Sequence, residues 1–449
     1  MFQDEKAIES ISNMNLIRNT FIVILLLSCT YTFPQSFFTL QQCIDYALMH
    51  STDLRDYDMQ LHEAEIDMQT ERNKFLPTIS AQVTNGLSTG FQQVLTKEMA
   101  GKYERVNSYS NSMAISLSVP VWSAEAQRTS VQLMRKNEQI VNAQKAEKVL
   151  EIKTKVVQCF YNAVLAKNRV RVAEQQLLQQ DTVLNTTKRM HSLGLRAQKD
   201  VLDAEMNYEQ DQYSLLQEQN AYEMALLELQ NVMMFDENLQ ISEEADSMTN
   251  FVIPLLSDAC EVIYQSHPNM QEFNMQIEVA QMQQKIIRRQ YYPSLSFGYE
   301  SGTSGMQFLS QENTFLISQW KNNSYHGALL TLKVPIYTRG DVRAQLNKAK
   351  ISEERATLLL QQARRAIYDD LSVMLTDIKQ SENLRRQALE TENVANRQYA
   401  KALSDYKLGN IPSYELNVYK TKYNTARLQS VQSEITLKYK MDLLKVIFE

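Results

Sequence analysis

Glycine and proline are scarce in this chain, whose 449 residues include only 10 glycines and 8 prolines. These residues most often interrupt helices, so their scarcity predicts that most of the chain is helical. Neither occurs between Val121 and Leu193, or between Asp341 and Leu408. Each of these spans holds roughly 70 residues and would form a helix of about 100 Å, which is longer than any single globular core.

Cysteine is also rare, and the net charge is small. Cys43, Cys159 and Cys260 are far apart, which predicts buried thiols and not a disulfide framework. A formal net charge of -6 gives no reason to expect a nucleic acid partner. The histidines share no metal-ligand spacing, and we expect them to be solvated surface residues. No phosphate-binding loop and no nucleophile with a base is recognisable, so we expect no enzyme activity, metal or cofactor.

Long apolar runs are missing except near the N-terminus. Phe21 to Leu27 reads FIVILLL and follows Arg18, a pattern typical of a secretory signal peptide and too short to span a bilayer. We expect residues 1–36 to be this signal peptide, with translation starting at Met14. Cys29 would be a lipidation site in an alternative interpretation. Beyond residue 36 no segment is predicted to be a transmembrane helix, so any membrane crossing must use β-strands.

The chain is predicted to consist of two similar halves, residues 37–256 and 257–449. Helix breakers recur at an interval of about 215 residues, the kind of self-similarity that marks an internal repeat. The matching pairs are Pro77 and Pro293, Pro120 and Pro335, and Gly194 and Gly409. Each half is predicted to contain one helix, two strands, a very long helix, a turn and a long helix. Thr39 with Gln42 forms a capping-box pattern at the first helix.

The long spans without glycine carry coiled-coil patterns. Apolar residues between Ile152 and Leu177 recur in alternating steps of four and three, which is a heptad seam. The second span repeats the pattern between Ala356 and Ile378. We therefore predict long antiparallel helical hairpins, with their polar faces beside water.

Four segments alternate between apolar and polar residues, at about 78–91, 112–121, 294–303 and 327–336. Each is about as long as a tilted membrane strand. Aromatic residues adjoin the prolines at their ends and predict an interface girdle of Phe75, Trp122, Tyr291, Tyr292 and Tyr337. A soluble sheet would alternate equally well. Long helices lead away from these strands, however, which favours a lipid-facing sheet. Four strands cannot close a membrane barrel, so several chains must contribute.

The turns between the long helices share a glycine and an acidic residue. Gly194 and Gly409 suit the left-handed end of a helix, and Pro412 suits the first turn of the next helix. Asp200 and Glu415 each follow their glycine by six residues. Such acids compensate the helix dipole, but symmetry in an oligomeric tube would also repeat them into rings that attract or filter ions.

The order and duplication of these motifs resemble the TolC-like outer-membrane factor family. The resemblance is carried by residues 38–48, Leu76-Pro77, residues 119–122 and the turn at residues 194–202. It implies a trimer whose twelve-stranded barrel lies in the outer membrane of a Gram-negative cell, among its lipids, and continues as a helical barrel through the periplasm. It also implies contact with a periplasmic adaptor protein and an inner-membrane transporter.

The resemblance also implies roles for residues at the turns. The adaptor-binding tips would be Leu193, Gly194, Leu195, Leu408, Gly409 and Asn410. The periplasmic gate would include Asp200, Tyr406 and Glu415. Ile411 stands where the family has a basic residue and Val418 where it has an acidic one, so a locking ion pair and a second acidic ring are not expected here.

The predicted function is a passive exit duct of a tripartite efflux or type I secretion system, with the cargo left open. The alternative is a soluble periplasmic coiled-coil scaffold or adaptor without a pore.

Overall fold

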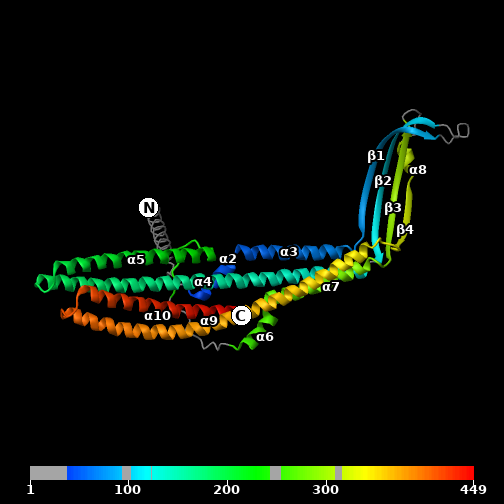
Figure 1. The fold of residues 1–449 in the computed structure, drawn as a ribbon. Helices are drawn as coiled ribbons and strands as arrows, with labels where there is room; N and C mark the ends of the chain where they lie inside the picture. The colour runs from blue at the N-terminus through cyan, green and yellow to red at the C-terminus, as the bar shows by residue number, and fades with distance from the viewer. Residues whose placement is uncertain (1–37, 94–102, 123, 243–253, 309–315, 449) are drawn as a thin grey trace, which may run out of the picture. The chain divides into compact units, whose positions relative to one another are not determined.

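Residues 38–93, 103–122, 124–242, 254–308 and 316–448 are described by the computed structural model (Figure 1). The predicted signal peptide, its start at Met14 and the candidate lipidation site Cys29 lie outside these residues. The chain divides into two compact units. We call residues 1–51, 152–252 and 378–446 the hairpin unit, and residues 52–151, 253–377 and 447–449 the strand unit.

The hairpin unit is built from helices. It contains α2 (Leu40–His50), α5 (Gln198–Met233), nearly all of α10 (Ser413–Phe448) and the later parts of α4 (Ala124–Ser192) and α9 (Asp341–Lys407). Short turns join α4 to α5 and α9 to α10, giving two helical hairpins (Figure 1). With 69 and 67 residues, α4 and α9 confirm the predicted uninterrupted helices. Part of the core consists of small and aromatic residues, among them Ala395, Tyr399, Ala402, Tyr406, Tyr423 and Ala426.

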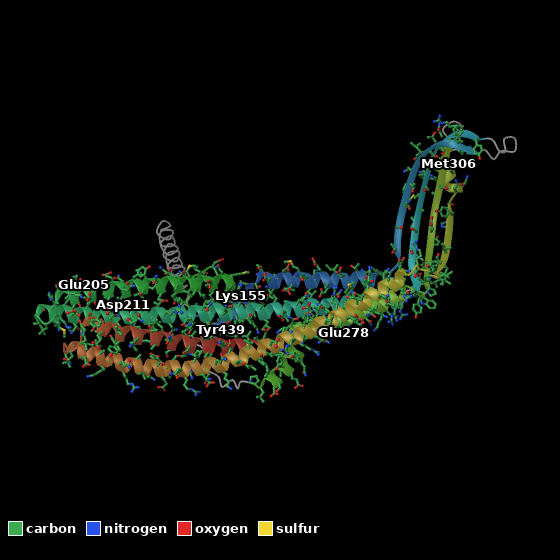
Figure 2. All side chains as sticks on the ribbon, in the orientation of Figure 1. Lys155, Glu205, Asp211, Glu278, Met306 and Tyr439 are labelled. Atoms are coloured by element: carbon green, nitrogen blue, oxygen red, sulfur yellow. The ribbon has the colours of Figure 1, made fainter. Side chains whose placement is uncertain are left out.

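The strand unit contains a four-stranded antiparallel sheet in the order β1 (Thr78–Gln93), β2 (Tyr103–Trp122), β3 (Ser294–Phe308), β4 (Tyr325–Lys333). Helices α3 (Thr52–Asn73), α6 (Leu256–Ser266), α7 (Pro268–Arg289) and α8 (Leu316–Asn322) accompany it, with the first parts of α4 and α9. An ion pair of 2.8 Å joins Lys136 of α4 to Glu278 of α7. Figure 2 labels Glu278.

The register of the sheet separates an apolar face from a polar one. Ile79 pairs with Leu117, and Ala81 pairs with Ile115. On the opposite face Ser80 pairs with Ser116, and their hydroxyls hydrogen-bond at 2.7 Å. Successive strand residues point to opposite faces, so the alternation in the sequence becomes a two-sided sheet.

The strands differ in length from the predicted ten residues. β2 begins at Tyr103 and not near residue 112, because its polar first half pairs residue by residue with the second half of β1, as far as Tyr103 with Gln93. β4 covers residues 325–333 and ends before the predicted residue 336.

The prediction of a single helix at the start of each half is wrong. Each half begins with two helices, α2 and α3 in the first and α6 and α7 in the second. α2 starts with the predicted capping box, in which the Thr39 hydroxyl accepts from the Gln42 amide at 3.4 Å. It ends at Ser51, whose backbone is not helical (φ -59°, ψ 121°), and α3 then begins. In the second half the break falls at His267, because Pro268 disfavours the helical conformation of the residue before it.

His267 is not the solvated residue expected from the sequence. Only 13% of its side chain is exposed, and its Nδ1 accepts from the Asn269 amide while lying 3.6 Å from the Glu147 carboxylate. Burial raises the pKa of that carboxyl group, and His267 partly opposes the shift.

The three cysteines in the described residues are free thiols, as predicted. Cys43 and Cys260 are buried, and Cys159 is half-buried. Burial raises the pKa of the Cys43 thiol to about 12, so this residue remains protonated and unreactive.

Candidate channel site at the hairpin turns

Both helical hairpins turn in the same way. Gly194 and Gly409 have φ values of +76° and +81°, as the sequence predicted. After the first glycine, the Leu195 amide donates to the Met190 carbonyl at 2.9 Å. After the second, the Asn410 amide donates to the Asp405 carbonyl, also at 2.9 Å. These bonds satisfy carbonyl groups at the helix ends and close each turn tightly.

The residues at the two turns are exposed. Leu193, Leu195 and Leu408 have exposed fractions of 68%, 69% and 72%. Asn410 and both glycines are exposed too, and open space surrounds the position of a Cβ on each glycine. The leucines predicted to form the tips are thus accessible at both turns.

Tyr406 lies in the core and joins the two hairpins. Its hydroxyl and the Thr187 hydroxyl on α4 are 2.7 Å apart. Because Thr187 already donates to the Val183 carbonyl at 2.7 Å, the tyrosine hydroxyl is the donor between them.

Arg196 makes a second connection between the hairpins, which the sequence reasoning missed. Its guanidinium donates to the carbonyl oxygens of Tyr406 at 3.2 Å and Ile411 at 2.8 Å. It also lies over the Tyr406 ring, 4.6 Å from the centroid. Arg196 follows Gly194 by two residues, the position that Ile411 occupies after Gly409. The equivalent position of Arg196 and Ile411 in the two repeats was the sequence signal that could have identified Arg196.

His191 fixes the segment that carries Arg196. Its Nδ1 donates to the Arg196 carbonyl oxygen at 2.8 Å, so the proton sits on Nδ1. His191 is therefore a second departure from the expectation that the histidines are solvated.

Asp200 and Glu415 lie in the first turns of α5 and α10, and both are half-exposed. Glu415 lines a groove of about 420 Å³ together with Arg397, Lys401 and Asp405. Val418 lines the neighbouring groove of about 780 Å³ between α9 and α10, where it presents an apolar side chain. Of the two positions on α10 considered for acidic rings, 415 and 418, only position 415 carries a carboxylate.

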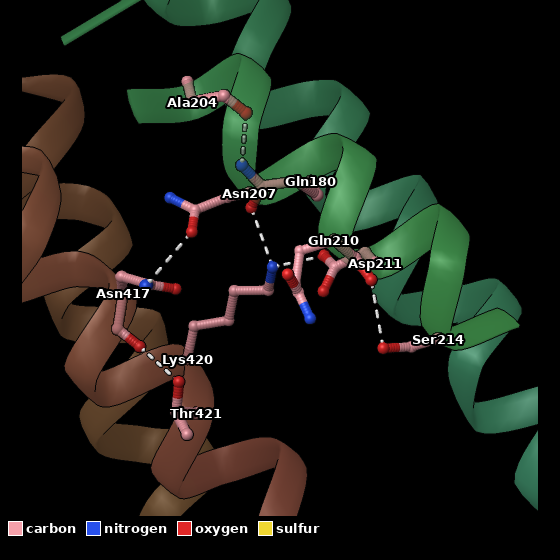
Figure 3. A network of polar contacts seen from close by, with 9 residues as sticks. All are labelled: Gln180, Ala204, Asn207, Gln210, Asp211, Ser214, Asn417, Lys420 and Thr421. Atoms are coloured by element: carbon pink, nitrogen blue, oxygen red, sulfur yellow. Dashed lines mark hydrogen bonds and ion pairs between the residues drawn. The ribbon is translucent and has the colours of Figure 1, made fainter. Parts of the chain in front are cut away.

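A buried polar network holds α10 against the first hairpin. Lys420 reaches from α10 to the Asp211 carboxylate on α5 at 2.5 Å and to the Gln180 side-chain oxygen on α4 at 2.8 Å (Figure 3). Gln180 donates to the Ala204 carbonyl at 3.1 Å, and Asn417 donates to Asn207 at 3.3 Å. Nothing in the local sequence pattern around Lys420 predicted this network.

The predicted girdle residues belong to one end of the sheet, which we call the aromatic edge. The register brings the starts of β1 and β3 level with the ends of β2 and β4 there. The five aromatic residues lie within about four residues of these strand ends along the chain, and all are exposed: Phe75, Trp122, Tyr291, Tyr292 and Tyr337. Exposed aromatic residues near the ends of alternating strands are typical of a membrane interface.

None of the helices in the described part of the chain combines the length and apolarity needed to cross a bilayer. The two-faced sheet, its aromatic edge and the long helical hairpins together define the class of outer-membrane channel proteins.

Comparison with known families agrees with this class. The sequence model of the outer membrane efflux proteins matches residues 43–233 and 260–439. The chain belongs to the outer membrane efflux protein family. A comparison with curated proteins found no match.

Solved channel structures share the fold at low sequence identity. CusC, described in a study of folding and transmembrane channel formation, has 15% identity and a TM-score of 0.77, with 91% of each chain covered. The Campylobacter jejuni CmeC outer membrane channel has 15% identity and a TM-score of 0.74, covering 91% of this chain and 85% of CmeC. The open state of the Neisseria gonorrhoeae MtrE channel has 17% identity and a TM-score of 0.71, covering 91% and 88%.

The chain is therefore an outer-membrane efflux channel protein with a TolC-like fold, which acts as a transport duct and not as an enzyme. Its place is the outer membrane and the periplasm. The soluble scaffold considered as the alternative is not favoured by these matches.

Proposed function

We propose that three copies of the chain assemble into one exit duct of a tripartite system. Each copy supplies its four strands to a twelve-stranded barrel, and the hairpins form the periplasmic tunnel. The observation that carries this proposal is the sheet itself. β1 and β4 are its outer strands, and within the described residues each has one edge without a partner strand. In a membrane such edges must be paired, and a four-stranded sheet cannot pair them with each other.

The test is assembly in detergent. Purified protein should migrate as an SDS-resistant trimer that dissociates on heating, and it should give single-channel conductance in planar bilayers. A monodisperse monomer with no conductance would contradict the proposal.

The exposed turns are the proposed contact site for a periplasmic adaptor protein, which connects the duct to an inner-membrane transporter. Leu193, Gly194 and Leu195 form one tip, and Leu408, Gly409 and Asn410 form the other. The exposure of the three leucines supports this role, because an adaptor would cover apolar surface that a single chain leaves in water.

The gate is proposed to lie beside these turns, with Asp200 and Glu415 repeated into rings by the threefold axis. Tyr406 would link the hairpins that must separate when the gate opens, which its hydrogen bond to Thr187 supports. Ile411 supplies a backbone carbonyl to Arg196 at this point, so an ion pair from the second hairpin is not needed to connect the two.

Glu415→Ala should reduce the cation selectivity of the channel by about twofold or more, because it removes three negative charges from the proposed ring. Reversal potentials in a salt gradient would measure the change. Glu434→Ala is the matched control, since it removes a carboxylate of the same helix that is paired to Lys438 at 2.9 Å. Equal selectivity in both variants would remove Glu415 from the constriction.

A further inference from the structure

The two edge strands that must meet between copies are unequal in length. β1 has 16 residues, whereas β4 has 9. Within the sheet, β4 pairs only with residues 294–302 of β3. The outer end of β3, from Thr303 to Phe308, extends beyond β4. We use outer end for the strand ends opposite the aromatic edge.

Helix α8 lies along this outer end of β3 and takes the place of a longer fourth strand. The Met306 amide donates to the Gln319 side-chain oxygen at 2.8 Å, and Asn323 donates to the Ser304 carbonyl at 2.9 Å. The Thr303 hydroxyl donates to the Trp320 carbonyl at 2.6 Å. Met306 marks this part of β3 beside α8 (Figure 2). Polar groups at the edge of β3 are thus satisfied without a strand.

Trp320 also fixes α8 against the apolar face of the sheet. Its indole N–H donates to Asn111 of β2 at 2.6 Å, reaching across Gly305, the buried partner of Asn111 in the register. Asn111 and Tyr109 both donate to the Asn85 side-chain oxygen, at 3.5 and 3.0 Å. The side-chain amides of Asn85 and Asn111 therefore pair with each other at the outer end of a face that is apolar toward the aromatic edge. α8 is held in a defined place, since it has contacts to both β2 and β3.

The difference in length determines what the next copy of the chain meets. β1 and β4 run in opposite directions, so they can pair as antiparallel strands of neighbouring copies. With the aromatic edges at one level, β4 is too short to reach the outer end of β1, around Leu87 to Gln93. Level with the outer end of β1, the element that a copy presents to its neighbour beyond β4 is α8.

We propose that α8 of one copy seats against the outer end of β1 of the next copy and seals the seam between subunits there. This rests on the proposed trimer. The partner surface is a second copy of this chain. Ile317 on α8 and Phe91 on β1 are left 66% and 72% exposed in one copy, and both would be covered by this contact.

Disulfide trapping tests the contact. Ile317→Cys is combined with Leu87→Cys in one variant and with Phe91→Cys in a second. All three positions are exposed, so the substitutions should not disturb the fold. Before oxidation both variants should run as SDS-resistant trimers. Mild oxidation should then link copies covalently, at least tenfold more in one of these variants than in the control pair of Ile317→Cys with Ile79→Cys, whose second site lies at the other end of β1.

The outcomes separate the two proposals. Trimers that link no more than the control pair in either variant would overturn the α8 contact while leaving the trimer in place. Absence of SDS-resistant trimers from the unsubstituted protein would instead contradict the proposed assembly, and with it the seam.

Discussion

Asp211→Ala should destabilise the hairpin unit by about 3 kcal/mol, because it leaves the Lys420 ammonium buried without its counter-ion. The side chains of Lys420 and Asp211 are only 6% and 17% exposed, and they are 2.5 Å apart. Gln180 still accepts from Lys420 in the variant, so the loss should lie toward the lower end of the range for broken buried pairs. Thermal unfolding followed by helical circular dichroism should show a midpoint lower by roughly 6–12 °C.

The same helix provides the control for this prediction. Glu205 pairs with Lys188 at 2.9 Å, but their side chains are 44% and 50% exposed (Figure 2 labels Glu205 and Asp211). Glu205→Ala should cost less than about 1 kcal/mol, because an exposed pair is screened by water. Lys420→Met combined with Asp211→Leu should recover most of the stability, since it removes both charges. Equal effects of Asp211→Ala and Glu205→Ala would show that burial of Lys420 contributes nothing.

The features that could be predicted from the sequence are those that depend on neighbouring residues. A turn that requires positive φ selects glycine, so Gly194 and Gly409 located both turns. Thr39 and Gln42 located the start of α2 because a capping box needs only four consecutive residues. The absence of glycine and proline predicted the bounds of α9 to within one residue and those of α4 to within three.

Features that depend on distant residues were missed. The first half of β2 lacks the apolar alternation that marks a strand, and it is held in the sheet by pairing with β1. α8 has seven residues, too few for a periodic pattern, and its position depends on β2 and β3. The contacts of Arg196 and Lys420 join residues 209 to 240 positions apart, so their partners could not be read from local spacing.

The Arg196 contacts lead to the second large expected effect. Arg196→Ala removes two hydrogen bonds from a charged donor and a cation–π contact, all of which connect the first turn to the second hairpin. Their combined loss should weaken the closed arrangement by about 2 kcal/mol or more. If opening separates the hairpins, as proposed, the ratio of open to closed channels should rise roughly thirtyfold, since 1.4 kcal/mol is a factor of ten. Planar-bilayer recordings of the purified channel measure this ratio directly.

Two further variants distinguish the geometry of Arg196 from its charge. One terminal nitrogen of Arg196 donates to both the Tyr406 and Ile411 carbonyls, and a lysine ammonium can replace that donor. Arg196→Lys keeps the charge but loses the guanidinium plane over the Tyr406 ring, so it should open the channel less than alanine does. Thr187→Val removes the acceptor of the Tyr406 hydroxyl. The double variant of Arg196→Ala and Thr187→Val should change the opening free energy by less than the sum of the two single changes, because both contacts act on the same tyrosine. Channels of Arg196→Ala that stay closed as often as the unsubstituted protein would show that the gate is held elsewhere. The proposed rings of Asp200 and Glu415 would then be the remaining candidates, because these residues lie in the first turns of α5 and α10.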